Sequence, residues 1–175
     1  DNAWHISLIR TFLDTGAYSP LATTAYPDSV SPLDGSTSSF YPAAWHLIAA
    51  MIVDLTQCPI TLSANAVNYV FATVVYPSGV YALLSVLFGN DAKKLFWGSL
   101  ASVAFAAFPW LLLTFGPLFP NLASLALMPV VSALFISLFE KGSRKPVRAI
   151  RFVLFIMGGV ALALVQPNTV FSCAV

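Results

Sequence analysis

The sequence predicts an all-α, polytopic transmembrane helix bundle with an N-terminal extracytoplasmic loop that contains interfacial helices. Hydrophobic residues make up 58% of the chain and charged residues only 9%, whereas roughly a quarter of the residues of a soluble domain are charged. The charges are also clustered, with none from Asp54 to Asp91, none from Lys94 to Glu140 and none after Arg151. Such gaps are long enough for membrane spans, because about 20 apolar helical residues cross a hydrocarbon core of about 30 Å.

The pattern divides the chain into two regions. Residues 1–65 hold five of the seven acidic residues and both histidines, and we expect them to form an extracytoplasmic loop with two short helices, at 1–14 and 43–55. Residues 66–175 should form the transmembrane region, with about four spans at 66–88, 95–115, 121–139 and 149–165. Three prolines inside these spans predict kinks, which membrane helices tolerate: Pro77, Pro109 and Pro129.

The basic residues predict the orientation of the spans. Seven of the eight lie in two short connections, around residues 93–94 and 141–151. Because basic connections face the cytoplasm, we expect a multi-pass cell-membrane protein with residues 1–65 outside. The chain begins at Asp1 without a signal-peptide pattern and stops within an apolar stretch, so we also expect it to be a fragment that lacks a preceding span. The sequence has no basic patch with interleaved aromatics, so we expect no nucleic-acid partner. The oligomeric state does not follow from the sequence.

Asp1 and His5 are neighbours on the first helix, within its apolar stripe. A carboxyl and an imidazole on such a surface need either a partner or a function. Asp1 suits an N-cap as well as a functional carboxylate, and a satisfied, partly buried histidine is the ordinary alternative for His5. The pair also suits two ligands of a divalent metal ion, but without a third ligand nearby no metal site or cofactor is assigned.

His46 is the only polar side chain of its apolar helix before Asp54. The helix is too short to span a membrane, so we expect a buried or re-entrant external helix, whose N-terminal dipole disfavours an imidazolium. A packing helix whose histidine caps a neighbouring carbonyl is the alternative. Gln166 and Asn168 follow the last span on the external side, where their amides suit either the wall of a cavity or a simple helix end.

Three segments carry a resemblance to a known group of proteins: residues 1–10 (DNAWHISLIR), 16–21 (GAYSPL) and 41–46 (YPAAWH). Their order resembles the first external loop of the GT-C superfamily, the polytopic glycosyltransferases that use polyprenyl-phosphate-linked sugars. The likeness covers residues 1 to about 90 and is greatest to actinobacterial membrane proteins of the DUF6541 type. The chain departs from the pattern of these proteins at one position. A second acidic residue often follows the first one, whereas this chain has Asn2 there.

The resemblance implies extracytoplasmic, inverting transfer of a sugar from a polyprenyl-phosphate-linked donor to a cell-envelope acceptor. Asp1 would be the catalytic general base. The partners would be membrane lipid and the lipid-linked donor, and a divalent metal ion is compatible with this chemistry. A transporter or flippase of lipid-linked saccharides and a noncatalytic membrane assembly subunit are the alternatives. The substrate-binding residues would be His5, His46, Tyr41, Gln166 and Asn168.

Overall fold

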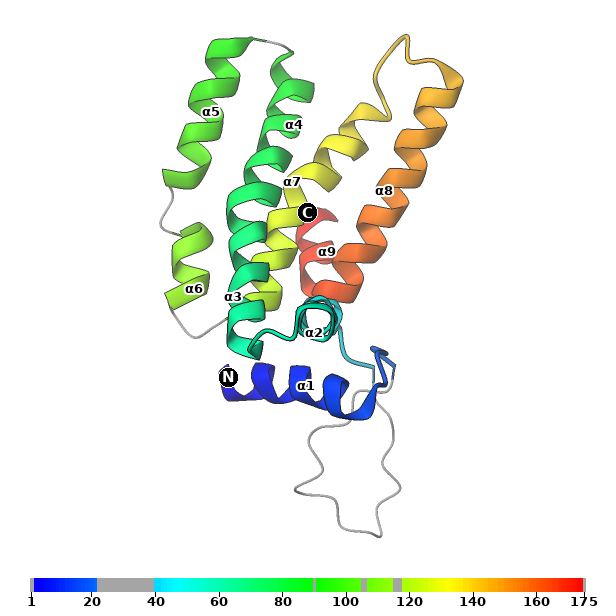
Figure 1. Cartoon of the computed structure of the whole chain (residues 1–175). Coiled ribbons are helices and arrows are strands. Elements are labelled where there is room, and N and C mark those ends of the chain that lie inside the picture. Colours follow the sequence, from blue (N-terminus) through cyan, green and yellow to red (C-terminus); the bar gives the residue numbers. More distant parts are fainter. Residues whose placement is uncertain (1, 22–39, 90, 105–106, 115–117, 175) are drawn as a thin grey trace.

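The protein is a bundle of long helices with two shorter helices lying across one end (Figure 1). The computed structural model describes residues 2–21, 40–89, 91–104, 107–114 and 118–174, which contain helices and no strands. Four helical stretches are long and apolar enough to cross a membrane: Ile60–Phe88, Ala92–Thr114, Phe119–Ser137 and Lys145–Val165. The predicted all-α, polytopic fold class is therefore confirmed.

The first span consists of α3 (Ile60–Val70), the π-helical turn η2 (Phe71–Val75) and α4 (Tyr76–Phe88). It begins at Ile60 instead of the predicted residue 66, because Pro59 takes the N-cap position and the helix starts directly after it. The wider turn of η2 comes just before Pro77, whose ring and missing N–H disturb the preceding helical turn. The disturbance predicted at Pro77 therefore takes the form of a π-helical turn.

The second span is interrupted near Pro109. It consists of α5 (Ala92–Ala104), η3 (Ala107–Leu111) and the short α6 (Leu112–Thr114). At Phe108 the backbone leaves the helical region, with φ −130° and ψ 131°. A residue before proline is pushed toward extended dihedrals, so Pro109 explains the interruption that the sequence predicts here.

The third and fourth spans are α7 (Phe119–Ser137) and α8 (Lys145–Val165), and α7 packs against both α4 and α8 (Figure 1). Glycines allow these close approaches. A Cβ atom at Gly79 of α4 would lie 3.1 Å from the backbone nitrogen of Val130, and one at Gly158 of α8 would lie 2.8 Å from the Val131 side chain. The helix α7 continues through Pro129.

The chain continues after α8 in a way that the sequence did not indicate. Gln166 is extended, and Pro167 starts another helix, α9 (Pro167–Ala174), where only a turn was predicted. Proline is favoured in the first helical turn, because its missing N–H has no intrahelical acceptor there.

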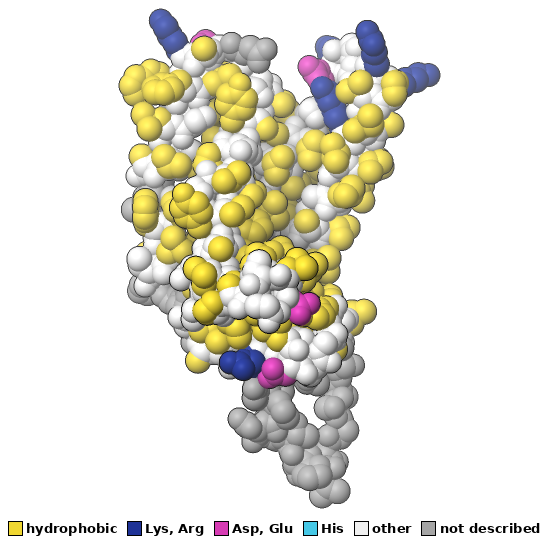
Figure 2. Space-filling model, viewed as in Figure 1, with side chains coloured by type: hydrophobic (Ala, Val, Ile, Leu, Met, Phe, Trp, Pro, Cys, Tyr) yellow, Lys and Arg dark blue, Asp and Glu magenta, His cyan; other side chains and the backbone are white. Residues whose placement is uncertain are grey.

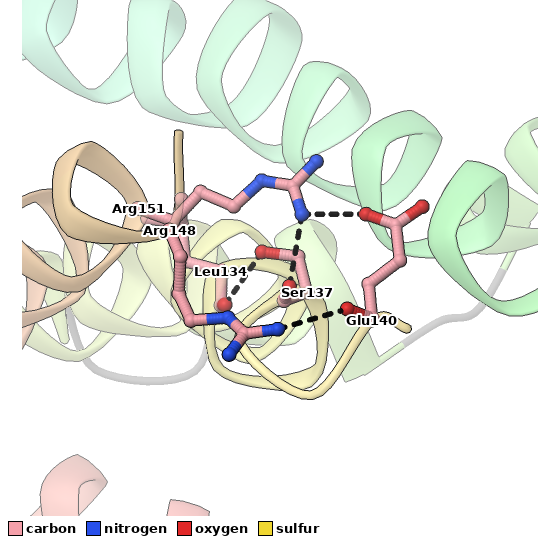
Figure 3. Close-up of polar contacts among 5 residues, drawn as sticks. All are labelled: Leu134, Ser137, Glu140, Arg148 and Arg151. Carbon is pink, nitrogen blue, oxygen red and sulfur yellow. Dashed lines mark hydrogen bonds and ion pairs between the residues drawn. The ribbon is translucent and has the colours of Figure 1, made fainter. Parts of the chain in front are cut away.

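The basic connections lie at one end of the bundle, where Lys and Arg side chains project beyond a lateral surface rich in hydrophobic side chains (Figure 2). At this end, Arg148 and Arg151 of α8 reach back to the end of α7 (Figure 3). Arg151 donates to the Ser137 carbonyl over 2.9 Å and pairs with the Glu140 carboxylate, while Arg148 donates to the Glu140 carbonyl over 3.4 Å. Cationic donors satisfy carbonyls that a helix C-terminus leaves without partners, so the two arginines hold the α7–α8 hairpin together.

The helices α1 (Asn2–Thr15) and α2 (Ala44–Thr56) lie at the opposite end (Figure 1). Their bounds agree closely with the predicted helices at 1–14 and 43–55. The buried face of α1 packs on α2 and on the ends of the spans, in a core that includes Ile9, Phe12, Trp45, Val67 and Val165. Both helices are thus attached to the bundle by a hydrophobic core, and this attachment positions the site described next.

Candidate functional site

The two histidines of the chain meet where α1 crosses α2. Nδ1 of His5 lies 2.8 Å from Nε2 of His46, within hydrogen-bond distance. One ring must donate an N–H and the other must accept it with a lone pair. His46 is fully buried and His5 is 8% exposed, so the pair lies inside the protein.

Aromatic rings enclose this histidine pair, and they form with it the histidine cluster, which consists of His5, His46, Trp4, Tyr41, Trp45 and Phe119. The centroid of the His46 ring lies 5.0 Å from that of Trp45, 5.5 Å from that of Trp4 and 5.7 Å from that of Tyr41. On the other side, the His5 ring lies 5.6 Å from Phe119, at the start of α7. These rings keep water from the imidazoles and leave them in a medium of low polarity.

This environment keeps His46 and Tyr41 uncharged at neutral pH. Burial, together with the neighbouring His5 imidazole, lowers the pKa of His46 from 6.5 to about 3. Burial also raises the pKa of the Tyr41 phenol, which therefore stays protonated at neutral pH. Nδ1 of His46 is buried and has no hydrogen-bond partner among the described residues. At pH 7 His46 thus acts as a neutral imidazole that can donate and accept hydrogen bonds.

Asn68 of α3 bonds to Trp45, one of the residues whose rings enclose the histidine pair. The indole N–H of Trp45 donates to Oδ1 of Asn68 over 3.0 Å. Because an indole nitrogen only donates, this contact determines which end of the Asn68 amide is the oxygen. Nδ2 of Asn68 is buried and has no hydrogen-bond partner among the described residues.

A cavity of about 700 Å³ lies beside this cluster, within the range of about 300–1,000 Å³ that is typical of ligand sites. It runs from the start of α1 between the first span and the interrupted part of the second. Phe119 and Asn68 contact both the histidine cluster and the cavity. Its described lining residues are Asn2, Asn65, Asn68, Tyr69, Ala72, Thr73, Pro109, Trp110, Leu113 and Phe119, none of which is charged.

The structure brings some of the predicted site residues together. His5, His46 and Tyr41 share the cluster described above, whereas Asp1 lies outside the described residues. Gln166 and Asn168 lie where α8 meets α9 and are not among the described residues that line the cavity. Their substrate-binding role, like that of the histidines, stays a prediction. Among the described residues, no group of three or more His, Cys, Asp or Glu side chains is arranged to hold a metal ion.

Asn65, Asn68 and Trp110 line the cavity but were not predicted as site residues from the sequence. One signal was available, because Asn68 is an amide within the apolar stretch 66–88, and polar side chains in membrane helices usually bond to a neighbouring helix. Its contact with Trp45 is of this kind. Trp110 had no comparable signal, because aromatic residues are common on lipid-facing surfaces.

Comparison with known proteins identifies the family of this chain. No curated protein and no solved structure matches the chain significantly. A model of a family of unknown function, DUF6541, matches residues 1–175, beyond the residues 1 to about 90 over which the resemblance was expected. The chain therefore belongs to the DUF6541 family.

Proposed function

We propose that this protein transfers a sugar, with inversion, from a polyprenyl-phosphate-linked donor to a cell-envelope acceptor on the extracytoplasmic side of the membrane. One observation carries the proposal: Asn2, which directly follows Asp1 in the chain, lines the cavity of about 700 Å³. The cavity lies at the α1–α2 end of the bundle, away from the basic connections. A donor attached to a lipid is held at the membrane surface, where the reaction has to take place.

In the proposed reaction the Asp1 carboxylate accepts the proton of an acceptor hydroxyl. The hydroxyl oxygen forms a bond to the anomeric carbon, while the bond from that carbon to the phosphate oxygen breaks. The lipid phosphate leaves with the electron pair, and attack from the opposite face inverts the anomeric centre. A single general base suffices for this step, which then needs no covalent sugar intermediate on the protein.

In this proposal His5 and His46 position the catalytic residue instead of contacting the substrate. Both rings are buried, and they are hydrogen-bonded to each other over 2.8 Å. His5 lies in the first turn of α1, so its contact with His46 holds this turn against α2. Small displacements of a catalytic group reduce reaction rates strongly. The function of the buried pair would be to prevent such displacements.

The test is a transfer assay with the full-length protein in lipid nanodiscs. A radiolabelled sugar on polyprenyl phosphate is the donor, and an extract of cell-envelope glycans is the acceptor. We expect the Asp1→Asn substitution to lower the rate by about a hundredfold or more, the usual contribution of a general base. The Asp14→Asn substitution makes the same change at the exposed far end of α1 and should leave the rate unchanged. Equal rates for the wild type and Asp1→Asn would remove Asp1 from the mechanism.

A transporter or flippase of lipid-linked saccharides is the second candidate, and one observation favours it. The cavity is bordered by both helix irregularities, through Ala72 and Thr73 of η2 and Pro109 and Trp110 of η3. Interrupted membrane helices often form the substrate sites of transporters. Movement of an intact lipid-linked sugar across the bilayer, without a transfer product in the same nanodisc preparation, would favour this candidate.

A noncatalytic assembly subunit is the third candidate. The mutual hydrogen bond of the buried histidines is also what two packing residues would form. This candidate predicts neither transfer nor transport. It also predicts that substitutions of His5 or His46 only destabilise the fold, because there is no activity to lose.

A further inference from the structure

The polar part of the cavity wall consists of amides and hydroxyls. Three asparagines line it, together with Tyr69 and Thr73. An amide offers both N–H donors and a carbonyl acceptor, and a hydroxyl offers one donor and two lone pairs. With no charged side chain among the described lining residues, this wall matches an uncharged ligand that itself carries several hydroxyls.

Asn68 gives an independent indication of a ligand. It lines the cavity although it is only 4% exposed. Its Oδ1 accepts from Trp45, and its buried Nδ2 has no hydrogen-bond partner among the described residues. A buried donor without an acceptor is unfavourable, so a ligand oxygen that reached Nδ2 would gain more than an ordinary hydrogen bond. Because Nδ2 is itself covered, a small rotation of a neighbouring side chain must accompany this contact.

The remaining wall is aromatic and aliphatic. Tyr69 and Trp110 are 67% and 59% exposed, so the faces of their rings are available to a ligand. Ala72, Pro109 and Leu113 add an apolar surface. A sugar ring carries hydroxyls at its edge and C–H groups on its faces, and it therefore matches a wall that contains both amides and aromatic rings.

We infer that this cavity binds an uncharged sugar ring, and that this ring belongs to the acceptor. The role as acceptor rests on the proposed transfer reaction, whereas binding of the ring does not. The phosphate of the donor has no cationic partner among the described lining residues and is therefore bound elsewhere. Asn65, Asn68 and Trp110 are the contacts that select the sugar.

The sugar ring has two sources, a soluble saccharide or the headgroup of a glycolipid. The full chain in phosphatidylcholine nanodiscs distinguishes them by native mass spectrometry. One arm adds lactose to the solution. A second places a monohexosyl diacylglycerol in the nanodisc, and a third replaces that lipid by phosphatidic acid, which has a charged headgroup and no sugar.

We expect retention of the hexosyl lipid or of lactose, and weaker retention of phosphatidic acid. Retention of lactose indicates a soluble acceptor, and retention of the hexosyl lipid that lactose does not displace indicates a glycolipid. The Asn65→Ala and Trp110→Ala substitutions remove exposed side chains and should each weaken binding about three- to tenfold, the usual effect of one lost contact. The Asn68→Asp substitution keeps an acceptor for Trp45 and removes the Nδ2 donor, and it should weaken binding at least as much.

The matched control is Asn121→Ala, which makes the same change at an asparagine outside the described cavity lining. Equal retention of phosphatidic acid and the hexosyl lipid would overturn the inference, as would equal loss of binding in Asn121→Ala and Asn65→Ala. Sugar binding without any transfer activity would count against the proposed function and against the role of the ring as acceptor, and it would leave the binding of the sugar ring in this cavity standing. The opposite result is transfer activity and sugar binding that Asn65→Ala and Trp110→Ala both leave unchanged. It would overturn this inference and leave the proposed function standing.

Discussion

At the scale of single residues, the central feature is a pair of buried histidines, of which His46 stays neutral at physiological pH. A histidine at a protein surface changes its charge near pH 6.5, which makes it a common pH sensor. His46 is instead enclosed by Trp4, Trp45 and Tyr41 and bonded to His5, so its imidazole keeps one charge state over the physiological range. A fixed charge state suits a positioning contact, because the geometry of α1 on α2 then does not change with pH.

The burial of His46 predicts that the protein loses stability in acid. Its pKa is about 3 in the folded protein and about 6.5 when exposed, so the unfolded chain binds the proton first. The contribution of neutral His46 to the free energy of unfolding should therefore be fully present above about pH 6.5. It should fall as the pH drops toward 3, by at most about 1.4 kcal/mol per pH unit. The measurement is the thermal unfolding midpoint in nanodiscs between pH 7.5 and pH 3.

The control for this prediction is His46→Gln. Glutamine keeps a nitrogen or oxygen near the position of the imidazole Nε2 and does not titrate. The variant should be less stable than the wild type at pH 7.5 and should show a smaller loss between pH 6.5 and pH 3. A pH dependence identical to that of the wild type would mean that other groups cause the acid sensitivity.

Both histidines could be predicted as site residues from the sequence, but their contact could not. His5 and His46 are 41 positions apart, and nothing in the local pattern of either helix indicates that the two rings meet. The amphipathic pattern of residues 1–14 put His5 on the buried side, as the structure does. The asparagines of the cavity were missed, because a single amide in an apolar stretch also fits ordinary helix packing.

At the scale of elements, the spans follow from composition, and their irregularities follow from proline. The π-helical turn before Pro77 and the interruption at Phe108 both occur where a proline removes a backbone donor. Composition could not locate the exact helix ends, since Ile60 and Phe119 begin their helices through local backbone preferences. The helix α9 was missed because Pro167 suits a turn as well as a first helical turn.

The close approach of α4 and α7 predicts that a side chain at Gly79 destabilises the bundle. A Cβ atom there meets the backbone nitrogen of Val130 at 3.1 Å, and backbone yields less readily than a side chain. We expect Gly79→Leu to lower the free energy of unfolding by about 1–3 kcal/mol, the usual cost of overpacking. The measurement is the unfolding midpoint in mixed micelles.

Gly159 is the matched control, because a Cβ atom there meets nothing within 4 Å. Gly159→Leu should be neutral or slightly stabilising, since leucine favours the helix over glycine. If both substitutions lowered the midpoint equally, steric contact between α4 and α7 would not be the cause.

At the scale of the whole molecule, polar functional groups and basic connections occupy opposite ends of the bundle. The α1–α2 end holds the histidine cluster and the cavity, and the other end holds the arginines that join α7 to α8 (Figure 3). We propose that the basic connections face the cytoplasm, as such connections generally do, and that the cavity therefore lies on the external side. The proposed transfer reaction requires this orientation, since a lipid-borne donor and a cell-envelope acceptor meet only on the external side of the membrane.

The most direct test of this account measures transfer on one side of the membrane. Right-side-out vesicles that contain the full-length protein and the polyprenyl-phosphate-linked donor are given a membrane-impermeant acceptor glycan, either outside or sealed inside. We predict a sugar-labelled product with the outside acceptor only, and a loss of that product in Asp1→Asn but not in Asp14→Asn. Product formed only with the inside acceptor, or formed equally by Asp1→Asn, would contradict the account.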